Sequence, residues 1–148
     1  MNRSRAPAFR SASAFVGPKV RVLIVGSLSR TWYADQSVLI ELFSWLSEEG
    51  AVPIVIGSSA FELTARAAST LCDKPVATVR DSDQAGVDRS IAGAGLCVVL
   101  VPRKTTSIDT TTSFEEAGPV VGEARRQGVP LLALYDNGDA DFFPVEQA

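Results

Sequence analysis

The sequence predicts an α/β fold in which about five parallel strands are flanked by helices. Two observations lead to this prediction. Short apolar runs alternate along the chain with segments of helical periodicity. The apolar runs are also almost free of polar residues, which is typical of parallel strands buried on both faces of a sheet. We therefore expect a parallel sheet with helices covering both of its faces.

The strands are predicted from apolar runs that end near glycine, proline or a polar loop. The first run, VRVLIVG, is rich in β-branched residues and ends in Gly26. The third run is more polar than the others and predicts a weaker strand. The five expected strands are VRVLIVG (20–26), VPIVIG (52–57), PVATVR (75–80), LCVVLV (96–101) and VPLLALY (129–135). With the helices between them, they predict a Rossmann-like three-layer sandwich.

The helices are predicted from the segments between these strands. Residues 38–46 form one apolar stripe at helical spacing, and this helix should end at Gly50. An Ala-rich segment over 61–71 can be capped by Ser58 or Ser59. A short helix is expected over 83–92, and a fourth from about 113 to 127.

The two ends of the chain differ from this pattern. Residues 1–18 are rich in Arg, Ser and Ala and contain no acids, so we expect a flexible N-terminal tail followed by a single domain over 19–148. An organellar transit peptide has the same compositional bias and stays as an alternative. The acidic segment 136–148 either packs Phe142 and Phe143 against the domain or frays.

Composition excludes several classes of function. The chain has 148 residues and a net charge of -3, so no basic face for DNA or RNA is expected. No apolar run approaches the roughly 20 residues that span a bilayer, so we expect no membrane partner. Two cysteines without metal-site spacing favour a buried thiol at Cys97, no metal and a cytoplasmic location. Since there is no histidine, proton transfer near pH 7 would fall mainly to carboxylates.

In an open parallel sheet, ligands bind beyond the carboxyl ends of the strands. The segment after the first strand begins at Gly26, where a ligand could approach the backbone. Ser27 and Ser29 add hydroxyl groups, and Arg30 offers a guanidinium suited to phosphate or carboxylate. The alternative for this segment is a plain polar connector.

The segment after the second strand carries Gly57, Ser58 and Ser59 directly before a helix. Backbone N–H groups and the positive end of the helix dipole would make it an anion site. An ordinary helix cap explains the same serines equally well. There is no Walker loop and no GxGxxG motif, so the usual dinucleotide site is not predicted. After the third strand, residues 80–83 are expected to form a loop and a helix cap.

The segment after the fourth strand, PRKTTSIDTTTSFEEAGP (102–119), is long and rich in hydroxyl groups. Such hydroxyls can bind the oxygens of sugar or phosphate, and long loops in compact domains usually carry function. Glu115 and Glu116 follow at the expected start of a helix, where acids also favour the helix dipole. The segment is either a ligand loop or a stabilised helix start.

The order of these segments resembles the SLOG superfamily, which includes the lonely guy phosphoribohydrolases and the Rossmann-like domain of DNA-processing proteins. The resemblance covers residues 19–136 and rests on element order and on the TxxE spacing of Thr112 and Glu115. In the phosphoribohydrolases, a PGGxGTxxE loop wraps phosphate and supplies a catalytic glutamate. The resemblance implies that Asp109, Thr111, Thr112 and Glu115 correspond to the GxGTxxE part, and that Arg89 corresponds to an upstream arginine.

This chain departs from the family motif at its glycines. Arg103 and Lys104 follow Pro102, and Asp109 and Thr111 replace the later glycines. Because glycine adopts conformations that β-branched threonine resists, a tight backbone cradle for phosphate is not expected. The stretch is also similar to the DxGTxxE segment of nucleoside 2-deoxyribosyltransferases. A TIR-like domain is a third option, although its usual order lacks the helix and strand expected over 60–80.

The leading hypothesis is a nucleotide- or nucleoside-binding domain of the SLOG type that needs no cofactor. N-glycosidic cleavage is a further option for this domain, with Glu115 and Arg89 as the candidate catalytic residues. A non-catalytic sensor that binds a nucleotide signal through the same segments is the alternative. A structural homo-oligomer is the third. In related folds the site is often completed across a dimer, so a homodimer is also compatible with the sequence.

Overall fold

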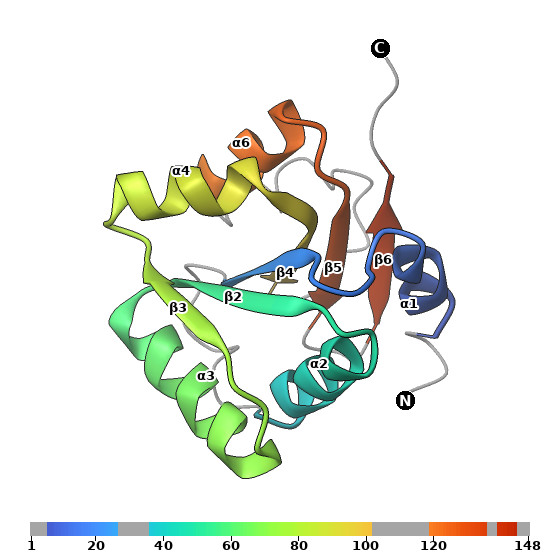
Figure 1. Cartoon of the computed structure of the whole chain (residues 1–148), viewed down its shortest axis with the longest axis vertical. Helices are drawn as coiled ribbons and strands as arrows, with labels where there is room; N and C mark the ends of the chain where they lie inside the picture. Colours follow the sequence, from blue (N-terminus) through green and yellow to red (C-terminus); the bar gives the residue numbers. More distant parts are fainter. Residues whose placement is uncertain (1–5, 27–35, 102–118, 136–138, 145–148) are drawn as a thin grey trace.

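A six-stranded sheet with helices on both faces forms the protein in the computed structural model (Figure 1). The structure describes residues 6–26, 36–101, 119–135 and 139–144. The strands are β1 (Arg21–Gly26), β2 (Val52–Gly57), β3 (Ala77–Arg80), β4 (Ala94–Val101), β5 (Leu131–Tyr135) and β6 (Ala140–Phe143). The expected Rossmann-like α/β fold is confirmed.

The strands lie in the order β3-β2-β1-β4-β5-β6. The first five run parallel to one another, so their carboxyl ends meet at one edge of the sheet, and β6 pairs antiparallel with β5. This edge is called the carboxyl edge below, and the opposite one the amino edge. From β1 the chain adds β2 and β3 on one side, and it then crosses back to add β4, β5 and β6 on the other side of β1. The carboxyl ends of β1 and β4 are therefore the topological switch point.

Two helical layers cover the sheet, one on each face. On the first face lie α1 (Ala6–Ser13), α2 (Gln36–Glu48) and α3 (Ser59–Cys72), and on the second lie α4 (Gln84–Ala92) and α6 (Pro119–Arg126). Successive strand residues point to opposite faces. Val22 and Ile24 therefore belong to the core under the first layer, and Leu23 and Val25 to the core under the second. Both faces are buried, which explains the continuous apolar runs.

Local signals set the helix boundaries. Ser58 is the N-cap of α3 and accepts a hydrogen bond from the Phe61 N–H at 3.3 Å. Asp73, with φ 56, caps the other end of α3 in the left-handed region. Asp83 caps α4 by accepting from the Gly86 N–H at 3.2 Å. Gly50, with φ 75, follows α2 as the sequence predicted.

We expected a flexible tail over residues 1–18, but the described part of this segment, from residue 6 onward, packs on the domain. Residues 6–13 form α1, which buries Ala8, Phe9 and Ala12 against the core. The ring of Phe9 meets that of Trp45 edge-on, with centroids 4.8 Å apart. The expected flexible tail was wrong for these residues because it was predicted from composition and not from the helical spacing of Ala8, Phe9 and Ala12. Three small or aromatic residues share one helical face, while arginine and serine supply the rest.

The acidic C-terminal segment packs onto the domain, which decides between the two alternatives left by the sequence. Residues 140–143 form β6, the outermost strand beside β5, and α1 packs over β5 and β6 (Figure 1). The ring of Phe142 lies 5.4 Å from that of Phe15, centroid to centroid. Phe143 packs against the core on the other face. The first and last described elements are therefore neighbours.

Cys97 is buried in β4, as expected, and burial raises the pKa of its thiol to about 12. The expected strand at 75–80 is shorter and lies at the edge of the sheet, where its residues are half-buried or exposed. The expected helix over 113–127 is described from Pro119 onward, as α6.

Candidate ligand site at the carboxyl edge of the sheet

The switch point brings together the origins of the two segments that the sequence singled out. Gly26, the last residue of β1, pairs with Leu100 one residue before the end of β4. The segments 27–35 and 102–118 therefore leave the sheet from neighbouring strands at the same edge. Crevices at this position are the usual ligand sites of open parallel sheets. The candidate site is thus the carboxyl edge around β1 and β4.

Most of the expected ligand-binding side chains belong to those two segments. Ser27, Ser29 and Arg30 lie in 27–35, outside the described residues. Asp109, Thr111, Thr112 and Glu115 lie in 102–118, also outside them. Their roles stay predictions from the sequence.

Gly26 and Gly57 end β1 and β2, and both face the ring of Phe61. A Cβ built on Gly57 would lie 2.5 Å from Phe61 Cδ2, and one built on Gly26 would lie 2.7 Å from Phe61 Cγ. Phe61 itself is 2% exposed. On the α2/α3 face, the space that a side chain would take at these strand ends is therefore filled by an aromatic ring. The structure thus gives both glycines a packing role that the sequence did not indicate.

The serines after β2 behave as a helix start. Ser58 caps α3 through its hydroxyl oxygen, so the capping interpretation is confirmed for this residue. Ser59 is the first residue of α3 and is exposed. The N–H groups of the first helical turn point toward the carboxyl edge, because α3 follows β2 and runs back along the sheet.

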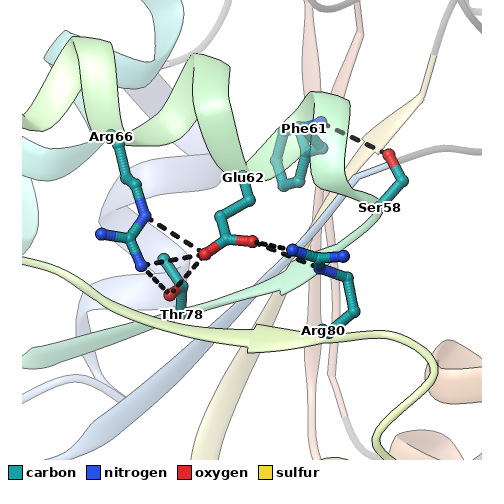
Figure 2. Close-up of polar contacts among 6 residues, drawn as sticks. All are labelled: Ser58, Phe61, Glu62, Arg66, Thr78 and Arg80. Atoms are coloured by element: carbon teal, nitrogen blue, oxygen red, sulfur yellow. Dashed lines mark hydrogen bonds and ion pairs between the residues drawn. The ribbon is translucent and has the colours of Figure 1, made fainter.

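A network around Glu62 joins the first turns of α3 to the edge strand β3 (Figure 2). Glu62 Oε1 accepts hydrogen bonds from Arg66 Nη2 at 2.9 Å and from Thr78 Oγ1 at 3.1 Å. Its Oε2 accepts from Arg80 Nη2 at 2.8 Å and Arg80 Nε at 3.2 Å. These contacts, chiefly the one from Arg80 and then the one from Arg66, hold the pKa of Glu62 below its usual value. Glu62 is thus a fixed, ionised carboxylate.

This network was not predicted from the sequence. The spacing of Glu62 and Arg66 is that of a helical i, i+4 ion pair, and this signal was available. Thr78 and Arg80 lie two residues apart and so share one face of β3. Only the parallel pairing of β3 with β2 brings that face under α3. Both Glu62 oxygens accept hydrogen bonds within the network. The main effect of the network is therefore to hold β3 and the guanidinium of Arg80 in place at the carboxyl edge.

A second polar pair lies at the end of β5, next to β4. Tyr135 pairs with Val101 across the sheet, and its hydroxyl bonds to the carboxylate of Asp141 on β6. Burial, followed by the nearby charges of Asp141 and Asp139, raises the pKa of Tyr135 to about 12. Tyr135 therefore remains protonated and acts as a hydrogen-bond donor at neutral pH. This pair was not predicted from the sequence, because no strand was expected at β6.

Arg89 lies apart from the strand ends. It is exposed in the last turn of α4, a helix that begins near the carboxyl end of β3 and ends two residues before β4 begins. The last turn of α4 is consequently nearer the amino edge of the sheet. The structure does not bring Arg89 together with Gly26, Gly57 or Ser58, and its catalytic role stays a prediction.

The described residues offer neither a metal cluster nor a membrane-spanning helix. No group of three or more His, Cys, Asp or Glu side chains among them is arranged to hold a metal ion. None of the helices in the described ranges is long and apolar enough to cross a bilayer.

Comparisons with known proteins assign no family. No protein-family model matches the chain, and no curated protein matches it either. Among solved structures, the chain is similar to L-sorbose reductase from Gluconobacter frateurii, a structure complexed with NADPH and L-sorbose. The identity is 12% and the TM-score 0.36, over 80% of this chain and 53% of that one. The chain spans about half the length of that reductase, and a likeness of this size carries no conclusion about function.

Proposed function

We propose that the protein binds a nucleotide or nucleoside at the carboxyl edge of its sheet, between β1 and β4. The observation that carries the proposal is the pairing of Gly26 with Leu100, which starts the two polar segments from adjacent strands at the switch point. Parallel α/β sheets bind nucleotides at this place, where helix N-termini and loop side chains converge. A small, phosphorylated or hydroxyl-rich ligand fits these segments by composition.

The proposed contacts divide by chemistry. Arg30 would form a bidentate contact with a phosphate, and Ser27 and Ser29 would donate hydrogen bonds to its oxygens. Thr111 and Thr112 would bind the hydroxyl groups of the sugar. In place of a glycine-rich backbone cradle, the phosphate would be held mainly by side chains, because the expected glycine positions after β4 carry other residues.

The finer proposal is that the bound nucleotide loses its base by N-glycosidic cleavage. Glu115 would stabilise an oxocarbenium-like ribosyl centre or activate the attacking water, as carboxylates do in glycoside hydrolysis. Two observations support a carboxylate in this role: the chain has no histidine, and the TxxE spacing of Thr112 and Glu115 resembles that of the SLOG phosphoribohydrolases. The alternative is a sensor that binds the same ligand through the same segments without cleaving it.

The catalytic proposal is tested by measuring the release of free base from nucleotides and nucleosides. The protein is incubated with AMP, CMP, NAD and deoxynucleosides, and free base is quantified by chromatography. We expect release from at least one of them, and a loss of about 100-fold or more in Glu115→Gln, a typical contribution of acid–base catalysis. Glu116→Gln is the matched control, since it makes the same change one residue away. Equal activity in wild type and Glu115→Gln would refute the role of Glu115.

Calorimetric titration with the same compounds tests binding separately. A measurable affinity without base release would favour the sensor. The absence of heat with every nucleotide and nucleoside, together with the absence of base release, would refute the binding proposal itself.

A further inference from the structure

A groove between α4 and α6 lies on the second face of the molecule, away from the α2/α3 layer. The two helices are neighbours in the fold (Figure 1). The groove has a volume of about 180 Å³. It is lined by Asp81, Gln84, Val87, Asp88, Ile91, Val120, Glu123 and Arg126. None of these residues belongs to the nucleotide site proposed above.

The groove is smaller than a typical ligand pocket. Its volume of about 180 Å³ lies below the about 300–1,000 Å³ of pockets for drug-sized ligands. The lining residues of α4 span positions 84 to 91, a rise of about 10 Å along the helix. One long side chain from an approaching segment fits this length.

The floor of the groove is apolar. Val87 and Ile91 are buried on one face of α4, and Val120 of α6 is half-buried. The residues at 84, 87, 88 and 91 follow the i, i+3, i+4, i+7 pattern of a single helical stripe. An occupant must therefore offer aliphatic groups along most of its length.

The rim of the groove is acidic, with three carboxylates to one guanidinium. Asp88 accepts a hydrogen bond from the neutral amide of Gln84 at 2.8 Å. Glu123 is held by Arg126 and accepts from Gln127 Nε2 at 3.0 Å. Hydrogen bonds from Gln127 and Arg126 lower the pKa of Glu123, so it stays ionised at neutral pH. The groove thus carries net negative charge.

We propose that this groove is a docking site for a basic peptide segment of a partner protein, which inserts one Lys or Arg side chain. Lysine and arginine combine an aliphatic stem with a cationic head, and they commonly lay the stem on an apolar surface. The stem would lie on Val87, Ile91 and Val120, and the head would reach Asp88, in the middle of α4, and Asp81, which precedes the helix. Charge complementarity between the rim and the segment argues for this partner.

Fluorescence anisotropy with three labelled peptides tests the proposal. The probes are Gly-Ser-Leu-Arg-Leu-Ser-Gly, the same peptide with glutamate in place of arginine, and the same peptide with norleucine there. We expect binding of the arginine peptide at sub-millimolar concentration, weaker binding of the norleucine peptide and none of the glutamate peptide. Raising the salt from 50 to 500 mM should weaken the arginine peptide, because exposed charges are screened. Equal binding of all three peptides, or no binding of the arginine peptide at 1 mM, would overturn the proposal.

Charge-removing variants assign the binding to the groove. The double variant Asp81→Asn/Asp88→Asn should weaken the arginine peptide by about fivefold to twentyfold, the range expected for two partly exposed ion pairs. Both positions are exposed, so the fold should be retained. Asp73→Asn is the matched control, because it removes one exposed carboxylate outside the groove at a left-handed position that asparagine tolerates. A loss in Asp73→Asn as large as that in the double variant would refute the assignment.

Amide chemical shifts provide the readout that does not depend on a variant. We expect the arginine peptide to shift the resonances of Gln84, Asp88, Val120 and Glu123, while AMP at the nucleotide site leaves them unchanged. Peptide-induced shifts confined to other parts of the molecule would overturn the proposal.

Discussion

The ring of Phe61 between the ends of β1 and β2 predicts an unusual cost for the smallest possible substitution, Gly57→Ala. The new Cβ would lie 2.5 Å from Phe61 Cδ2 and 3.1 Å from Phe61 Cβ. Carbon atoms are in optimal contact at about 3.5–4.0 Å, so the ring must withdraw by about 1 Å. Phe61 is 2% exposed, which leaves it no solvent-facing space to move into.

The magnitude follows from two opposing effects. Overpacking a closed core typically costs about 1–3 kcal/mol. Replacing glycine by alanine restricts the unfolded chain and stabilises the fold by about 0.4–1 kcal/mol where the conformation is permitted. Gly57 is not among the positive-φ glycines, so this gain applies. We expect a net loss of about 1–2 kcal/mol in the free energy of unfolding, a sizeable share of the roughly 5–15 kcal/mol typical of a domain.

Urea unfolding of a double-mutant cycle isolates the contact. The cycle contains Gly57→Ala, Phe61→Leu and the pair, and we expect a coupling energy of at least about 1 kcal/mol, because the leucine side chain has no ring facing residue 57. Gly17→Ala is the control, since its new Cβ would meet no heavy atom closer than Val20 Cγ2 at 4.0 Å. If Gly57→Ala costs as much beside leucine as beside phenylalanine, the steric explanation is refuted.

Three further predictions concern other parts of the described structure. Phe9→Ala should lower the free energy of unfolding by about 3–5 kcal/mol in thermal or urea melts, because it empties a buried site beside Trp45; a value near zero would mean that α1 is not packed. Glu62→Gln should speed amide exchange in β3 and reduce the loss of stability on acidification. The lowered pKa of Glu62 gives stability that is present above its unfolded value of 4.5 and lost as the pH falls through the folded value. Identical acid profiles for wild type and variant would contradict that network. The raised pKa of Tyr135 gives stability that is complete below 10.0 and lost as the pH rises toward about 12, so Tyr135→Phe should flatten alkaline unfolding, and an unchanged alkaline profile would count against it.

The sequence predicted the sheet well because the buried strands have an unambiguous composition. The runs at 20–26, 52–57 and 96–101 are apolar on both faces, and they became β1, β2 and β4. Strand β3 was predicted less sharply than the others. It is an outermost strand of the sheet whose residues are half-buried or exposed, so its sequence is less apolar. The N-terminal helix was missed because its buried residues are few and its arginines and serines dominate the composition.

The sequence predicted part of the candidate site. Expecting a parallel sheet places the ligand segments beyond the carboxyl ends of the strands, and the place of Ser58 before an Ala-rich helix predicts its capping role. The position of the switch point between β1 and β4 comes from the strand order in the structure. The contacts of Phe61 with two glycines and of Arg80 with Glu62 join residues from different strands and helices. Such contacts depend on strand order and register, which composition and periodicity do not specify.

The meeting of α1 with β6 has a consequence for how the chain folds during synthesis. Helix α1 is synthesised before β6, and the strand that it covers follows more than a hundred residues later. Until β6 emerges, Phe15 has no Phe142 to contact, and the apolar face of α1 is only partly covered. This pairing has the longest sequence separation in the described structure, and contacts of that kind form slowly. The contact between α1 and β6 should therefore form only after translation has passed Phe142, and until then α1 keeps part of its apolar face exposed, which favours aggregation.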